Sequence, residues 1–337
     1  MKKILVTGGA GYIGSHTLIE LIENTGCEVI SADNYSNSAA KTYERVKEIT
    51  GKVVKHYDID LCDGNAVGKM MQENKDIDGV IHFAAFKSVP ESIEQPLLYY
   101  HNNIVSLINI LAYRIPNFIF SSSCSVYGNI EKLPVNESTP LNAISPYGYT
   151  KQVGERLIQD FTRSNTRIKA VALRYFNPVG AHVSGNIGEV PLQRPANLVP
   201  IITQTAIGKL KETTVFGNDY NTRDGSCIRD YVHVSDIARA HVDAITYLNE
   251  NNDAPPYSVF NLGTGSGVSV LELINTFEKV SGHKLNYRIG GRREGDVASI
   301  YSDISLAKKI LGWTPKYSLE DMMLSAWKWE LNMKSGV

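Results

Sequence analysis

The chain has 337 residues, 43% of them apolar, which is enough for one large α/β domain with a sizeable core and a smaller second domain. Its 34 Lys and Arg nearly balance its 35 Asp and Glu, and no basic block typical of a nucleic-acid-binding protein interrupts the sequence. No apolar run reaches the length of a membrane span, and the opening MKKILVTGG is too short for a signal peptide.

Cysteine usage indicates a reducing compartment. Cys27, Cys62, Cys124 and Cys227 lie far apart, form no CxxC pair and have no metal-ligand spacing with histidine. We therefore expect reduced thiols in a cytoplasmic protein, with no metal site, no nucleic-acid partner and no membrane partner.

The first motif is a glycine-rich turn. Residues 3–7 are an apolar run that predicts a strand, the segment TGGAGYIG follows, and apolar periodicity through 18–22 predicts a helix. Gly8, Gly11 and Gly14 are three apart, as needed where the backbone turns sharply and approaches a pyrophosphate at a helix N-terminus. This pattern predicts a dinucleotide site, although glycine triplets also occur in plain turns.

The next predicted strand selects the dinucleotide. Residues 27–33 end in Asp33, 19 positions after Gly14, where such folds place a carboxylate that accepts hydrogen bonds from the adenosine ribose. A 2′-phosphate would be repelled there, and the following loop NYSNS contains no arginine to compensate. Asp33 therefore predicts NAD; the alternative is a helix-capping aspartate.

Alternation of strand and helix continues through the first half of the chain. Strands are expected at 53–60 and 78–85 with a helix near 64–74, then a helix at 97–113 and a last strand within 167–181. This period predicts a doubly wound parallel sheet. Side chains after these strands are expected beside the adenine or the rest of the cofactor, namely Asp60, Leu61, Phe83, Ala84 and Lys87.

A serine-rich strand end and a following helix carry the chemistry. The apolar run 117–120 is followed by three serines, and Pro146 is suited to the first position of a helix. Tyr147 and Lys151 then stand four apart on one helix face. Free tyrosine titrates near roughly 10, so Tyr147 can act as a base at neutral pH only if a positive charge such as that of Lys151 lowers its pKa.

A Tyr-x-x-x-Lys pair also occurs by chance. The second such pair, Tyr43 and Lys47, is interpreted as an exposed helix face. Tyr147 differs because Ser123 precedes it at the carboxyl end of a predicted parallel strand, where such sheets place their ligands. The alternative is a serine turn followed by an ordinary helix start.

The second half of the chain is less regular. Loops rich in Gly and Pro follow residue 178, and helices are expected at 235–249, 269–281 and 317–333. We expect a nucleotide-binding domain over 1–178 and a second domain over 179–337, with segments near 232–262 returning to the first.

Eight motifs in order, TGGAGYIGSH, SSSCSVYG, SPYGYTK, RYFNPVGAH, FGNDY, RDYVHV, NLGTG and RREGD, give the chain a resemblance to the UDP-glucose 4-epimerase family of the extended short-chain dehydrogenase/reductase superfamily. The likeness spans nearly the whole length. It implies a Rossmann-type doubly wound α/β fold with a smaller α/β substrate-binding domain. It also implies a homodimeric enzyme of galactose metabolism that interconverts UDP-galactose and UDP-glucose through a transient 4-keto sugar, with tightly bound NAD.

The resemblance assigns roles residue by residue. Tyr147 would be the acid/base, Ser123 would hydrogen-bond the reacting oxygen, and Lys151 would hold the nicotinamide ribose and lower the pKa of the tyrosine. The residues expected to bind the cofactor are Gly8, Gly11, Tyr12, Ile13, Gly14, Asp33, Asn34, Asn37, Ser38, Asp60, Leu61, Phe83, Ala84, Lys87, Asn102, Ser123, Tyr147, Lys151 and Tyr175. Those expected to bind the substrate are Lys87, Ser123, Tyr147, Asn177, Asn197, Leu198, Thr214, Phe216, Arg229, Arg293, Asp296 and Ile300.

Two alternative functions differ from the epimerase in a few identifiable residues. A nucleotide-sugar 4,6-dehydratase would carry an Asp-Glu pair where this chain has Cys124 and Ser125, and a cofactor-sensing regulator would typically lack the Tyr-x-x-x-Lys pair. Ile300 is smaller than the tyrosine of strict glucose/galactose epimerases, so UDP-N-acetylhexosamines are a further candidate substrate. The sequence leaves open that specificity, the pathway, the dimer affinity and whether Arg292 or Arg293 contacts the diphosphate.

Overall fold

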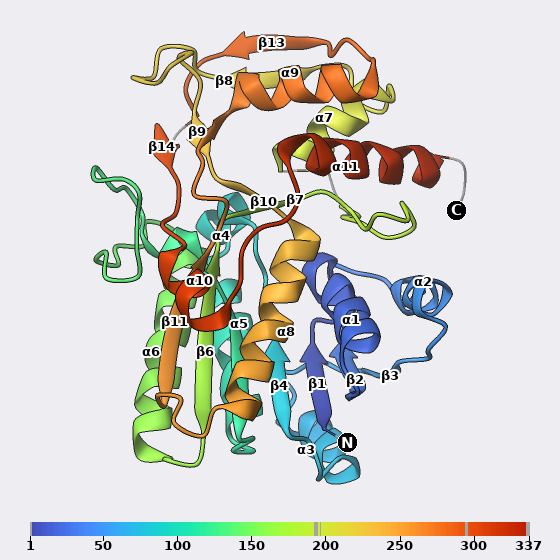
Figure 1. The fold of residues 1–337 in the computed structure, drawn as a ribbon, viewed down its shortest axis with the longest axis vertical. Coiled ribbons are helices and arrows are strands. Elements are labelled where there is room, and N and C mark those ends of the chain that lie inside the picture. The colour runs from blue at the N-terminus through green and yellow to red at the C-terminus, as the bar shows by residue number, and fades with distance from the viewer. Residues whose placement is uncertain (1, 192–194, 196, 294–295, 335–337) are drawn as a thin grey trace.

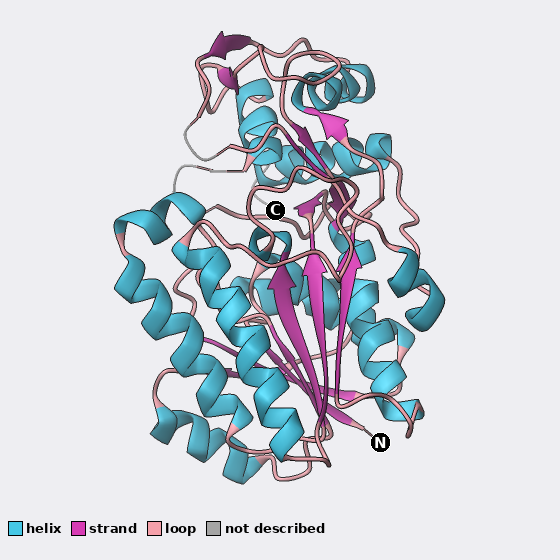
Figure 2. Cartoon of the chain, turned by 90° about the vertical axis from the view of Figure 1, so that its left-hand side faces the viewer, coloured by secondary structure: helices cyan, strands magenta, loops and turns pink. Residues whose placement is uncertain are grey.

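The computed structural model describes residues 2–191, 195, 197–293 and 296–334. Its main layer is a seven-stranded sheet in the order β11-β6-β5-β4-β1-β2-β3, with every pair parallel (Figures 1 and 2). The strands are β1 (Lys3–Thr7), β2 (Glu28–Asp33), β3 (Lys55–Asp58), β4 (Gly79–His82), β5 (Asn117–Ser123), β6 (Lys169–Tyr175) and β11 (Tyr257–Leu262). The predicted doubly wound α/β fold is confirmed.

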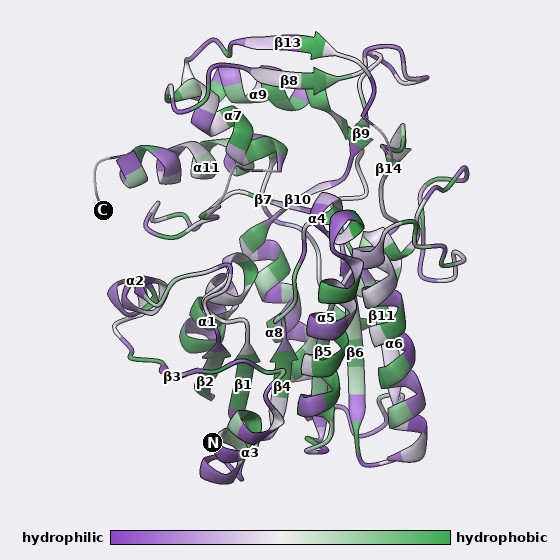
Figure 3. Ribbon diagram, turned by 180° about the vertical axis from the view of Figure 1, so that it is seen from behind, coloured by the Kyte–Doolittle hydropathy of each residue, from purple (hydrophilic) through white to green (hydrophobic). Residues whose placement is uncertain are grey.

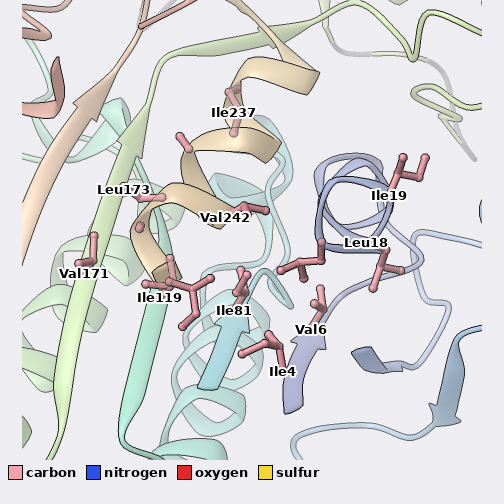
Figure 4. Packing of buried hydrophobic residues seen from close by; sticks show 14 of the residues in the cluster. Ile4, Val6, Leu18, Ile19, Ile81, Ile119, Val171, Leu173, Ile237 and Val242 are labelled. Carbon is pink, nitrogen blue, oxygen red and sulfur yellow. The ribbon is translucent and has the colours of Figure 1, made fainter. Parts of the chain in front are cut away.

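Helices cover both faces of this sheet because its strands are apolar on both sides. Ile4 and Val6 of β1 belong to one buried cluster with Leu18 and Val242, as Figure 4 shows, whereas Leu5 belongs to the opposite cluster. The helices that contribute to the first cluster are α1 (Tyr12–Asn24), α2 (Lys41–Thr50), α8 (Val234–Glu250) and α10 (Ser305–Leu311), and those of the second are α3 (Gly64–Glu73), α5 (Pro96–Leu111) and α6 (Pro146–Ser164).

A smaller layer lies beyond the carboxyl ends of the strands (Figure 1). Its core contains Ile202, Leu273, Phe277 and Met323. The elements here are α7 (Leu198–Ala206), β8 (Thr213–Phe216), α9 (Val270–Ser281), β13 (Tyr287–Gly290) and α11 (Leu319–Lys334). Short strands connect the layers: β7 (Asn177–Val179) with β10 (Tyr231–His233), and β9 (Ile228–Arg229) with β12 (Val268–Ser269) and β14 (Ser299–Ile300). The remaining helices are α4 (Val89–Glu94) and η1 (Cys124–Val126).

Late segments of the chain join the main sheet. β11 pairs with β6 along its whole length, and α8 packs against α1. The division of the chain at residue 178 stays a prediction. Glu294 and Gly295 of the RREGD motif lie outside the described residues.

One interpretation from the sequence is wrong. Tyr43 does not lie on an exposed helix face: it is 5% exposed, and its hydroxyl is 2.8 Å from the Ser31 hydroxyl. The amphipathic face of α2 turns this tyrosine onto the sheet while Lys47 stays exposed.

The described ranges bear on a membrane span and on a metal site. None of their helices combines the length and apolar character needed to cross a membrane. Across the same residues no group of three or more His, Cys, Asp or Glu side chains could hold a metal ion.

Candidate active site

A cavity of about 700 Å³ opens at the carboxyl ends of the strands, where the chain order reverses between β1 and β4. This is the switch point at which open α/β sheets bind ligands. Of the residues expected to bind the cofactor, all except Ser123 line this cavity. Of those expected to bind only the substrate, Asn197 lines it.

The glycine turn holds the backbone close to its neighbours. Gly8 has a positive φ of 71°, and a Cβ there would lie 2.8 Å from the backbone nitrogen of Ala84. A Cβ on Gly14 would lie 2.2 Å from the carbonyl oxygen of Gly8. Gly11 precedes α1 as its cap, and among the described residues no side chain occupies that capping position. The helix N-terminus is therefore open to an anionic group in the cavity.

Asp33 ends β2 at the rim of the cavity and shapes two loops. Its Oδ2 accepts a hydrogen bond from the backbone N–H of Ala10 at 3.0 Å. Its Oδ1 accepts from the backbone N–H of Tyr35 and the hydroxyl of Ser38, each at 2.9 Å. The carboxylate thus ties the glycine turn to the loop after β2, in addition to facing the cavity.

The helix α6 begins at Pro146 as predicted, with Ser145 accepting a hydrogen bond from the N–H of Gly148 at 3.1 Å. Tyr147 and Lys151 are both buried on its inner face, and Lys151 Nζ lies 5.9 Å from the centre of the Tyr147 ring. The ammonium donates to the carbonyl oxygen of Ser121 at 2.8 Å. The proposed acid/base pair therefore faces the serine-rich end of β5.

Burial dominates the electrostatics of this pair. Loss of solvent raises the pKa of Tyr147 well above its ordinary value, while hydrogen bonding with Ser123 acts in the opposite direction. Burial lowers the pKa of Lys151 to about 7, and the charge of Glu155 opposes that shift. Desolvation disfavours the charged forms of both residues in the protein alone, and the expectation that Lys151 lowers the pKa of Tyr147 stays a prediction.

Ser123 lies at the end of β5, 6% exposed. Its hydroxyl lies 3.0 Å from the Ser125 hydroxyl and accepts from the Ser125 N–H at 3.2 Å. Tyr175 at the end of β6 lies beside it in register, with its hydroxyl 2.6 Å from that of Ser121. Asn102 finds a partner within α5, donating to Asn103 Oδ1 at 2.9 Å.

The sequence did not single out Glu189. Its Oε1 accepts from Lys87 Nζ and from Asn197 Nδ2, both at 2.9 Å, at the edge of the same cavity. The residue lies in an irregular loop, so no periodicity or motif signal marks it. Tyr99 was also missed; it lines the cavity from α5 and donates to Glu91 at 2.7 Å.

A second polar cluster lies in the smaller layer. Asp296 Oδ1 lies 2.8 Å from a guanidinium nitrogen of Arg293 and 3.4 Å from one of Arg229. The Arg293 guanidinium also stands 5.6 Å over the Phe216 ring. Arg292 instead pairs with Asp219 at 2.9 Å and stacks on Tyr220.

The other residues expected at the substrate lie on several elements. Asn177 begins β7, Leu198 begins α7 and Thr214 lies in β8 next to Phe216. Ile300 pairs in register with Arg229, and its side chain is 7% exposed within an apolar cluster that includes Val126 and Phe176.

Comparisons with known proteins show which family the chain resembles. The sequence model of the family described as GDP-mannose 4,6 dehydratase matches residues 5–325. UDP-glucose 4-epimerase of Bacillus subtilis is 48% identical, covering 99% of this chain and 98% of that protein. The structure of UDP-glucose-4-epimerase from Stenotrophomonas maltophila, with bound NAD and formylated UDP-arabinopyranose, has a TM-score of 0.96 and 44% identity over 100% of both chains. The UDP-Glc/GlcNAc 4-epimerase of Campylobacter jejuni has a TM-score of 0.85 and 38% identity over 98% of this chain and 100% of that one.

The family model alone would not separate an epimerase from a dehydratase, since its description names the latter. The full-length identity to named epimerases does separate them, and Cys124 and Ser125 stand where a dehydratase carries its Asp-Glu pair. The chain belongs to the UDP-glucose 4-epimerase family, within the extended short-chain dehydrogenase/reductase superfamily.

Proposed function

We propose that this protein interconverts UDP-galactose and UDP-glucose by inverting carbon 4 of the hexose, with NAD as its tightly bound cofactor. The observation that carries the proposal is the shared cavity: Tyr147 and Lys151 line it together with the glycine turn and Asp33. An oxidising cofactor and an acid/base group can therefore meet at one carbon. The full-length likeness to UDP-glucose 4-epimerases supports the same activity.

The residues present fit NAD. Gly8, Gly11 and Gly14 leave no side chain between the cavity and the N-terminus of α1, which suits a pyrophosphate. Asp33 offers carboxylate oxygens to ribose hydroxyls and would repel a 2′-phosphate. When bound, NAD supplies the site with a hydride acceptor that becomes a donor in the second half of the reaction. Its nicotinamide ring also brings a positive charge that favours the phenolate form of Tyr147.

The protein's own side chains would carry the proton of the 4-hydroxyl. Tyr147 would take the proton of the 4-hydroxyl in the oxidising half of the reaction and would return it in the reducing half. Ser123 hydrogen-bonds the same oxygen, which keeps it near the phenol through both halves. Lys151 holds the nicotinamide ribose and is itself fixed by the Ser121 carbonyl.

The keto sugar must turn over between the two halves, so the site has to hold UDP firmly and the hexose loosely. We assign the firm binding of UDP to three residues. Arg229 and Arg293 offer charge-assisted hydrogen bonds to the diphosphate, and Asp296 offers its carboxylate to the uridine ribose. Arg293 is preferred to Arg292 because it shares Asp296 with Arg229. Phe216 would pack on the uracil.

UDP-N-acetylhexosamines are a second candidate substrate. The observation that favours them is Ile300, which is smaller than tyrosine and lies in register beside Arg229. A UDP-Glc/GlcNAc 4-epimerase with the same fold supports this extension.

We further propose a homodimer in the cytoplasm. α5 and α6 pack side by side (Figure 3) and expose apolar side chains, among them Leu97 at 81%, Ile108 at 48% and Tyr149 at 47%. A two-fold axis would bury such a pair of helices against its copy. The four free cysteines suit a reducing compartment.

The purified protein tests the proposal directly. Denaturation should release NAD in near-stoichiometric amount, and the native protein should convert UDP-galactose to UDP-glucose without added NAD. A protein that releases no dinucleotide, or that needs added NADP, would contradict the proposal.

A further inference from the structure

A row of buried polar side chains crosses the sheet next to the serine-rich strand end. Ser122 of β5, Arg174 of β6 and Asn261 of β11 are neighbours in register, each buried. Glu155 of α6 meets this row from the helix layer. None of these four residues lines the described cavity, and the proposed reaction has so far given them no role.

The centre of the row is an ion pair shut off from solvent. Arg174 Nε donates to one oxygen of Glu155 at 2.8 Å, and a terminal guanidinium nitrogen donates to the other at 2.6 Å; both side chains are 5% exposed. The hydroxyl of Ser122 donates to Glu155 at 2.5 Å. Arg174 also donates to the hydroxyl of Tyr127 at 3.0 Å.

Such a pair is a costly way to gain stability. Removing two charges from water costs so much that well-packed apolar side chains of similar volume often serve the fold as well or better. What the bidentate pair adds is a fixed orientation between the elements that carry it. Here those elements are the helix with the proposed acid/base group and the strand next to the one that carries the proposed catalytic serine.

Glu155 of this ion pair is aligned along α6 with the proposed acid/base pair. Tyr147, Lys151 and Glu155 are four apart, so they share one face of α6. Lys151 bonds to the carbonyl of Ser121, and Glu155 bonds to the hydroxyl of Ser122. α6 is thereby fixed along β5 at two consecutive residues, directly before Ser123.

We propose that Glu155, clamped by Arg174 and Ser122, is a positioning residue of the epimerase site that sets α6 against β5 and keeps the ammonium of Lys151 in place and charged. This inference rests on the proposed function and adds to it a residue pair outside the cavity. Glu155 touches neither substrate nor cofactor and acts through Lys151.

The charge of Glu155 also affects the protonation of Lys151, because Lys151 is buried. The titratable and charged groups around Tyr147 and Lys151 are Glu155 on α6, His82 on β4, Tyr99 on α5, Cys124 on η1, and Arg174 and Tyr175 on β6. Burial keeps His82 neutral near pH 7, with its pKa lowered to about 3. The carboxylate of Glu155 raises the pKa of Lys151 against its burial. Without that carboxylate, Lys151 loses its proton at lower pH.

Two variants and a control separate positioning from stability. Glu155→Met/Arg174→Met replaces the ion pair by an apolar pair of similar volume, and Ser122→Ala removes only the hydrogen bond to Glu155. Asp160→Asn is the matched control, because Asp160 forms an exposed ion pair with Arg156 at 2.7 Å on the same helix. The melting temperature, kcat and KM for UDP-galactose, and the pH dependence of kcat are measured for each protein.

We expect the double variant to fold and to lose about 10-fold or more in kcat at little change in KM, with the alkaline fall of activity moved to lower pH. Ser122→Ala should lose about 3-fold in kcat, and Asp160→Asn should match the wild type. A folded double variant with wild-type kcat and pH profile overturns the proposal; if that variant does not fold, unchanged kcat in Ser122→Ala overturns it. Wild-type protein without epimerase activity would refute the proposed function, whereas active wild type beside unaltered variants refutes the positioning role alone.

Discussion

Asp33→Ala is the substitution whose consequences the structure defines most fully. In the protein alone this carboxylate already accepts three hydrogen bonds, from Ala10, Tyr35 and Ser38. Removing the carboxylate should therefore lower the free energy of unfolding even in the cofactor-free protein. A residue that served only the ribose would have no such effect.

The size of the effect follows from the exposure of the three donors. The N–H of Ala10 is buried, with Ala10 4% exposed, and an unpaired buried donor costs about 1 to 3 kcal/mol. The donors of Tyr35 and Ser38 are partly exposed and can hydrogen-bond to water instead. Loss of each of these two bonds should therefore cost about 1 kcal/mol or less. The free energy of unfolding should fall by about 1 to 5 kcal/mol. Retained NAD should fall as well because the ribose loses its acceptor.

Denaturant unfolding of the cofactor-free protein measures the first quantity, and absorbance of the dinucleotide released on denaturation measures the second. The control is Asp58→Ala, an exposed carboxylate at the register partner of Asp33 in β3, which should stay within about 0.5 kcal/mol of wild type. If Asp33→Ala matches this control in both stability and NAD content, the assignment of Asp33 is wrong.

Three further predictions concern the proton carrier, the dimer and pH. Tyr147→Phe should lose roughly 100-fold or more in turnover with UDP binding intact, measured by initial rates and calorimetry; a variant that keeps most of its turnover refutes the assignment. Leu97→Asp should give a monomer in light scattering where wild type gives a dimer, and a monomeric wild type at micromolar concentration contradicts the interface. Burial lowers the pKa of His16 to about 3 and that of His241 to about 4, so the unfolded chain binds more protons below roughly pH 6.5. Stability should therefore fall as pH drops from 6.5 toward 4, by up to about 1.4 kcal/mol per pH unit for each histidine, and His241→Gln should flatten that slope in denaturant unfolding if the reasoning holds.

The sequence was sufficient to predict the features that depend on residues close together in the chain. The glycines before α1 and the apolar strand before Asp33 are signals within a few residues of each other, and they place both features at one edge of the sheet. The same is true of Pro146, which fixes the start of α6 and hence the common face of Tyr147 and Lys151.

What the sequence could not show depends on residues far apart in the chain. Tyr43 was placed on an exposed face because its partner, Ser31, lies on a neighbouring strand. Glu155 and Arg174 look like ordinary surface charges until β6 and α6 are packed together. The rise in the pKa of Tyr147 could not be predicted for a related reason, because burial is a property of the whole fold.

The last prediction concerns Ile300, which we propose as the residue that sets the breadth of the substrate range. Its side chain packs in a buried cluster with Val126, Tyr127 and Phe176, and β14 sets it beside Arg229 of the proposed diphosphate site. Isoleucine holds its bulk close to the backbone because it is branched at Cβ, so it cannot swing away as a linear side chain could. An acetamido group at carbon 2 should then fit with strain worth roughly 1 to 3 kcal/mol, which gives measurable but weaker turnover of UDP-N-acetylglucosamine beside good turnover of UDP-glucose.

Two substitutions at this position test the argument in opposite directions. The cluster is already closed around Ile300, so the larger ring of Ile300→Tyr must extend out of it; we expect this variant to lose turnover of the acetylated sugar and to keep that of UDP-glucose. Ile300→Val removes one methylene and should raise the rate on the acetylated sugar. Melting temperatures show whether either variant is merely unstable. Wild-type protein with no detectable conversion of the acetylated pair, or a folded tyrosine variant that retains it, would show that the side chain at 300 does not control access.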